Sequence, residues 1–120
     1  SKMADLYNIY SGTDKVQFVS ISVDPNRDSL AALKAYAKRY GVNDNRWVFL
    51  RAPMTKVMDL YEDGFKLGGI LPANHSTKFI LVDQTATIRG YYDTFDDVSM
   101  KILKTHIKEL AGKLKDTSKR

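Results

Sequence analysis

The chain has 120 residues, a net charge of +5 and 43% apolar residues, which is enough for one domain with a buried core. It contains no cysteine, which excludes disulfides, thiolate metal sites and cysteine nucleophiles within these residues. It has neither a run of about 18 apolar residues, which would predict a membrane span, nor the pattern of a signal peptide at its first residues.

The first half of the chain alternates between helical and strand-like apolar spacing. We predict helices over residues 2–10 and 30–40, and strands over residues 16–23 and 47–50. The apolar composition of residues 16–23 favours an interior strand.

The helix over residues 30–40 has signals at both ends. Asp28 or Ser29 is placed to cap its start, and Gly41 to end it. Its predicted apolar face consists of Leu30, Leu33, Ala37 and Tyr40.

The second half predicts a helix, a hairpin and a last helix. The first helix covers residues 55–65, with Val57, Met58, Tyr61 and Phe65 on its apolar side. Strands over residues 77–82 and 87–92 form a β-hairpin, and the first of them suits a central strand covered on both faces. The last helix covers residues 98–114, with Ile102, Leu103, Ile107, Leu110 and Leu114 buried. The order α-β-α-β-α-β-β-α predicts an α/β fold with a mixed sheet whose last strand is antiparallel.

His75 is the candidate functional residue, because it lies in a short polar turn directly before an apolar strand. The turn at Asp24-Pro25 is a second strand end that could lie near it, and sites gather at strand ends in α/β sheets. Asp28, Asp96 and Asp97 have the positions of caps, as Asp24 has.

Other kinds of site find little support in the sequence. We expect His106, in the middle of a lysine-rich helix, to be solvated. Gly68-Gly69 matches no phosphate-loop pattern, and no nucleophile elbow supports a serine triad. The C-terminal lysines predict a solvated helix face rather than a nucleic-acid site, since aromatic residues do not alternate with them.

Three motifs, in the right order, resemble the SCO/SenC family. Val19–Asp28 resembles the family's SVDPxRD stretch. Leu33–Gly41 followed by Trp47–Leu50 resembles its LKxYAxxYG…WxFL stretch, and His75–Asp83 resembles its HSxxxxLVD stretch. Ile88–Tyr92 extends the match, so that the similarity covers about residues 3 to 112.

The resemblance implies a thioredoxin-like fold, a mixed sheet flanked by helices. Members bind copper through the two cysteines of a CxxxC motif and a distant histidine, to which His75 corresponds by motif. They help to deliver copper to the CuA site of cytochrome c oxidase, and some act as thiol-disulfide reductants. The implied partners are the CuA subunit or other copper proteins. The implied location is periplasmic or otherwise extracytoplasmic and membrane-anchored, or the mitochondrial inner membrane facing the intermembrane space.

The family's CxxxC motif follows an N-terminal strand and opens the first helix, and it is absent here. We therefore expect residues 1–120 to be the C-terminal part of a single thioredoxin-like domain, which begins inside that helix and lacks the strand before it. We do not expect these residues alone to hold copper, since Cu(I) prefers thiolates to a lone imidazole.

Two other functions fit the same elements. One is a thioredoxin-like thiol-disulfide reductase or peroxidase whose cysteine lies outside these residues. The other is a cysteine-free binding module of the same fold. Whether the full-length protein is an enzyme stays open at this point, with a metallochaperone favoured.

The absent strand has a consequence for stability. In a thioredoxin-like sheet it lies between the strands at residues 16–23 and 77–82, and each buried backbone group left unpaired there costs about 1–3 kcal/mol. Several such groups exceed a typical domain stability of about 5–15 kcal/mol. We predict that residues 1–120 alone are not a stable monomer. An upstream segment, a strand-swapped dimer or direct pairing of the two strands would fill the gap.

Overall fold

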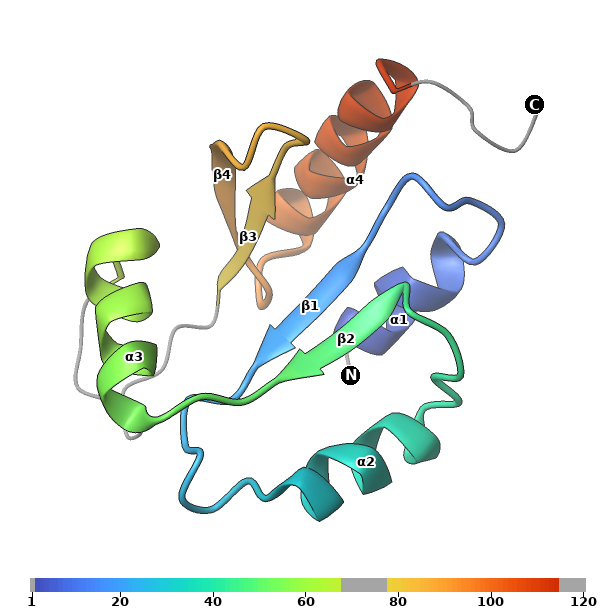
Figure 1. The fold of residues 1–120 in the computed structure, drawn as a ribbon. Helices are drawn as coiled ribbons and strands as arrows, with labels where there is room; N and C mark the ends of the chain where they lie inside the picture. The colour runs from blue at the N-terminus through green and yellow to red at the C-terminus, as the bar shows by residue number, and fades with distance from the viewer. Residues whose placement is uncertain (1, 68–77, 115–120) are drawn as a thin grey trace. The chain divides into compact units, whose positions relative to one another are not determined.

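The computed structural model describes residues 2–67 and 78–114 (Figure 1). The elements are α1 (Lys2–Ile9), β1 (Phe18–Ile21), α2 (Leu30–Arg39), β2 (Trp47–Leu50), α3 (Met54–Asp59), a π-helical turn η1 (Leu60–Gly64), β3 (Lys78–Val82), β4 (Ile88–Asp93) and α4 (Asp97–Gly112). The predicted order of helices and strands is confirmed. The chain forms two compact units, within residues 1–76 and within residues 77–120, and each is described by itself.

Each unit contains one two-stranded sheet. In the first unit β1 pairs with β2 in parallel, and in the second β3 pairs with β4 in antiparallel orientation, as predicted for the hairpin. Each sheet lies within one unit, so direct pairing of the strands predicted at residues 16–23 and 77–82 stays a prediction.

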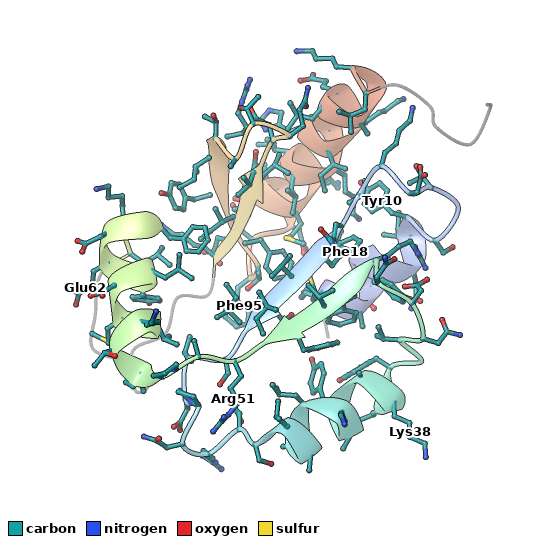
Figure 2. The ribbon with its side chains drawn as sticks, in the orientation of Figure 1. Tyr10, Phe18, Lys38, Arg51, Glu62 and Phe95 are labelled. Carbon is teal, nitrogen blue, oxygen red and sulfur yellow. The ribbon has the colours of Figure 1, made fainter. Side chains whose placement is uncertain are left out.

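Aromatic side chains form the core around the first sheet. Trp47 is 2% exposed, and its indole N–H donates to Ser20 Oγ at 2.9 Å. Rings from α1, from α2 with its C-cap, and from β2 surround it, with centroid separations of 4.9–6.4 Å from Trp47 to Tyr7, Tyr36, Tyr40 and Phe49. Phe18, labelled in Figure 2, packs edge-on against Tyr7. The sequence matches this because β2 places Trp47 and Phe49, two residues apart, on one face of the strand.

The ends of α2 follow the sequence signals. Ser29 is the cap, and its Oγ accepts from Ala32 N–H at 3.1 Å. Gly41 has a positive φ of 70°, and the bonds Val42 N–H to Ala37 O and Gly41 N–H to Lys38 O form a Schellman motif. The predicted apolar face is only half-buried at Leu33, Ala37 and Tyr40. Its first residue, Leu30, is 64% exposed and is not covered with the rest of that face. Leu30 is in the first turn, at the very start of the helix.

α1 is tied to the loop before β2 by polar contacts. Asp44 accepts from the Tyr7 hydroxyl and from Arg46, which also donates to the carbonyl of Tyr10 at the end of α1. The Arg46 guanidinium lies 4.6 Å from the centroid of the Tyr7 ring. The side-chain hydrogen bond from Arg46 lowers the pKa of Asp44.

The helix predicted over residues 55–65 is α3 followed by the π-helical turn η1. Val57 and Tyr61 are buried and pack with half-buried apolar residues of the same unit. No described helix is both long and apolar enough to cross a membrane.

In the second unit, Asp83 organises the hairpin turn. Its carboxylate accepts from the Thr85 and Thr87 backbone N–H groups and from the Thr85 hydroxyl, and it forms an ion pair with Arg89. The Thr85 hydroxyl is the largest cause that lowers the pKa of Asp83, to about 2. Within the turn, Ala86 has a positive φ of 64°. The pairing of the two strands shifts register between Leu81 and Val82, just before the turn.

α4 begins at its cap Asp96, whose carboxylate accepts from Val98 N–H, as the sequence predicts. It buries Met100, Leu103 and Ile107, while Leu110 and Leu114 are half-buried. The predicted burial of Ile102 is wrong, because its side chain is 44% exposed and lies off that buried face.

The two strands predicted to be interior are less covered than expected. β1 is shorter than residues 16–23, and Val19 is 42% exposed. In β3 no residue is fully buried, and Val82 is 42% exposed. An interior strand has a strand neighbour on each side. β1 and β3 have the composition of interior strands, but each has one strand neighbour in the sheet of its own unit.

Candidate functional site

The turn after β1 is the part of the candidate site that the structure describes in detail. Ser22 is buried, and its hydroxyl donates to the Asp28 carboxylate at 2.8 Å while its oxygen accepts from Asp24 N–H at 3.1 Å. The Asp24 carbonyl accepts from the N–H groups of Arg27 and Asp28. One buried hydroxyl therefore holds both ends of the Asp24–Asp28 turn.

Arg51 fastens this turn to the end of β2 (labelled in Figure 2). Its Nε and Nη2 donate to the Pro25 carbonyl at 3.1 and 2.6 Å, and Nε also donates to the Asp28 carbonyl at 2.8 Å. The planar guanidinium holds Nε and Nη2 in a fixed fork towards the Pro25 carbonyl, a geometry that the compact ammonium of a lysine cannot reproduce. Sequence reasoning missed Arg51, since its partners are 23 and 26 residues away in the chain.

Asp24 shapes the turn through its backbone. Its half-buried carboxylate has no hydrogen-bond partner among the described residues. Asp28, predicted as a cap together with Ser29, instead receives the Ser22 hydroxyl. The turn thus presents one free carboxylate beside the carboxyl end of β1, where sites gather in α/β sheets.

His75 lies outside the described residues, as do Gly68-Gly69. Its role as a metal ligand and its predicted proximity to Asp24 therefore stay predictions. The described chain resumes at Lys78, the first residue of β3. Asp83 closes that strand through its turn hydrogen bonds, so the apolar run after His75 has a fixed end.

The donor side chains of the described residues decide whether copper could be held among them. Within residues 2–67 and 78–114 no group of three His, Cys, Asp or Glu side chains could hold a metal ion. The whole chain has no cysteine, and the softest donors for Cu(I) are thus missing. The described residues alone do not fit a copper centre.

His106 is bonded rather than solvated, which corrects the sequence-based expectation. The Tyr92 hydroxyl and His106 Nδ1 are 2.6 Å apart, and the two rings meet edge-on at 5.7 Å. Tyr92 is 4% exposed, and burial raises its pKa. The contact joins β4 to α4, and periodicity within either element alone could not reveal it.

Gly90 makes room for this pair. A Cβ atom at position 90 would lie 2.6 Å from the Tyr92 hydroxyl, closer than side-chain atoms approach. The glycine therefore lets the Tyr92 ring lie over the strand and reach His106. The Ile88–Tyr92 motif owes its glycine to this contact.

Comparisons with known proteins agree on the family. The family model described as SCO1/SenC matches residues 1–112. The fold is similar to the crystal structure of a SCO1/SenC family lipoprotein from Bacillus anthracis str. Ames, with a TM-score of 0.74 and 28% sequence identity over 92% of this chain and 69% of that chain. No curated protein matches the chain significantly. The α/β, thioredoxin-like fold is thus confirmed, and the chain belongs to the SCO1/SenC family.

Proposed function

We propose that the full-length protein binds copper and helps to deliver it to the CuA site of cytochrome c oxidase. The observation that carries this proposal is the family match over residues 1–112, together with the ordered motifs around Asp24 and His75. Copper is the cargo in this proposal, and the CuA subunit or another copper protein is the acceptor.

His75 is the proposed imidazole ligand. A neutral imidazole binds copper well, and soft thiolates complete a site that prefers Cu(I). Because these 120 residues contain no cysteine, the thiolates of such a site come from another segment or chain. The turn after β1 also supports the proposal, because hydrogen bonds from Ser22 and Arg51 hold this strand end in place.

The test is copper affinity of the full-length protein, measured by competition with a chromophoric Cu(I) chelator. His75→Ala should weaken binding by at least about tenfold, since even the loss of a hydrogen bond to a metal ligand costs about 10–100-fold. The matched control is His106→Asn, which removes the other histidine of the chain. Unchanged affinity in His75→Ala, or equal losses in both variants, would sink the ligand assignment.

Assays of the full-length protein also distinguish the copper proposal from its two alternatives, a thiol-disulfide reductase or peroxidase and a binding module. Reduction of a disulfide substrate or turnover of peroxide without copper would favour a thioredoxin-like thiol-disulfide reductase or peroxidase. Neither copper binding nor redox turnover would favour the binding module. The cysteine chemistry of the first alternative also needs residues outside these 120.

We further propose an extracytoplasmic, membrane-anchored location. The support is the fold similarity to a protein described as a lipoprotein. Addition of a membrane-impermeant lysine reagent to intact cells tests it: labelling of the protein supports the proposal, and protection until lysis opposes it.

The prediction that residues 1–120 alone are not a stable monomer implies that another strand completes the fold. β1 and β3 each have one paired neighbour in the two-stranded sheet of their own unit, so each sheet offers an edge that another strand could join. We propose that a further segment of the protein, or a second copy through strand swapping, supplies it. Sedimentation of residues 1–120 alone should show dimers or unfolded chains; a cooperatively unfolding monomer would contradict this.

A further inference from the structure

The outer face of α4 combines a row of lysines with an apolar edge. Lys101, Lys104 and Lys108 follow at spacings of three and four residues, so they line one side of the helix. All three are exposed, and none has an ion-pair partner within the described part of the chain. Positive charge on this face is therefore not neutralised by its own unit.

Large apolar side chains border this row. Phe95, labelled in Figure 2, is 80% exposed, Val98 is 63% exposed and Ile102 is 44% exposed. Val98 and Ile102 are one helical turn apart, and Lys101 lies between them in sequence. They belong to a different side of the helix from the buried Met100, Leu103 and Ile107. The packing of α4 against its hairpin therefore leaves this edge uncovered.

The acidic residues of α4 do not interrupt the lysine row. Asp97 lies in the first turn, where it complements the helix dipole, and it precedes the row on the same side, four residues before Lys101. Glu109 lies on the apolar side, one residue after Lys108. Asp96 is occupied as the cap. The cationic part of the face thus runs from Lys101 towards the C-terminal end of α4.

We propose that this face of α4 binds the surface of an anionic membrane. Lysines are attracted to anionic headgroups, and aromatic and aliphatic side chains beside them enter the boundary between headgroups and acyl chains. Charge complementarity selects an anionic surface, and the exposed Phe95 selects one that accepts apolar groups. The inference rests on the proposed membrane-anchored location, which keeps the domain beside a bilayer, and is independent of copper binding.

The test is co-sedimentation of the unlipidated full-length protein with vesicles. We expect binding to vesicles of equimolar phosphatidylglycerol and phosphatidylcholine, weak binding to phosphatidylcholine alone, and release at high salt. The triple variant Lys101→Glu, Lys104→Glu and Lys108→Glu should lose about a hundredfold in affinity, since each lysine near such a surface contributes about fivefold. Phe95→Ser should also weaken binding. Because Phe95 is 80% exposed, this change should leave the thermal unfolding curve unchanged, which a melt of the variant verifies.

The matched control reverses three exposed lysines of the other unit, Lys34, Lys38 and Lys56, for the same change in net charge. It should retain vesicle binding. Equal losses in both triple variants would mean that net charge alone attracts the protein, and would overturn the proposal. Binding to polyglutamate but not to the vesicles would overturn it in favour of an acidic protein partner. Copper affinity of each variant is measured in parallel, so that failure here is separable from failure of the copper proposal.

Discussion

Replacement of Arg51 tests how the turn at the candidate site is held. Arg51→Ala removes two hydrogen bonds to the Pro25 carbonyl and one to the Asp28 carbonyl. A hydrogen bond from a charged donor contributes about 1.5–3 kcal/mol, but Arg51 is exposed, so water offsets part of the loss. We expect the free energy of unfolding to fall by about 1–2 kcal/mol, measured by urea denaturation of the full-length protein.

Two further variants sharpen this test. Arg51→Lys keeps the charge but lacks the planar Nε–Nη2 fork on the Pro25 carbonyl, so it should lose a large part of the same stability. Arg27→Ala is the matched control, because Arg27 lies in the same turn, is exposed and has no described side-chain partner. It should change stability by less than about 0.5 kcal/mol. Equal effects of Arg51→Ala and Arg27→Ala would refute the proposed role of the guanidinium.

Three other predictions concern the hairpin and α4. Gly90→Ala should destabilise the protein by about 2–3 kcal/mol, because its Cβ would displace the Tyr92 hydroxyl from His106; Gly112→Ala, which has open space around it, should be neutral or stabilising in thermal unfolding. Ala86→Gly should stabilise by about 1 kcal/mol, since it relieves a positive φ of 64° in the hairpin turn, and a lower unfolding midpoint would speak against that backbone conformation. The folded-state pKa of Asp83, about 2, is below the ordinary aspartate value of 3.8, so its stabilising contribution is complete above pH about 4 and is lost as the pH falls towards 2. Unfolding midpoints of the wild type and Asp83→Asn should converge over that range, and parallel curves would contradict the shift.

Local signals in the sequence predicted much of the fold. Ser29 and Gly41 mark the ends of α2 because a cap and a left-handed residue act within a few positions. The run Trp47–Leu50 is a strand with the predicted bounds, since its apolar residues stand between a polar loop and a proline. The family motifs then supplied the candidate site, which periodicity alone could not have identified.

What the sequence did not predict depends on contacts between distant residues. Arg51 reaches carbonyls in a turn more than 20 residues away, and the Tyr92–His106 pair joins a strand to a helix. Helical spacing placed Ile102 on the buried side, yet the hairpin covers only the narrower face of Leu103 and Ile107. Spacing along a helix does not distinguish an exposed apolar residue from a buried one, or a hydrogen-bonded histidine from a solvated one. Only tertiary packing distinguishes them.

X-ray absorption at the copper edge of the full-length protein tests the central claim most directly, because it reports the atoms bound to the metal. The copper-loaded wild type should show sulfur scattering together with the multiple-scattering pattern of one imidazole. His75→Ala should lose the imidazole pattern, while His106→Asn should retain it. Identical spectra for the wild type and His75→Ala would contradict the assignment of His75 as the copper ligand.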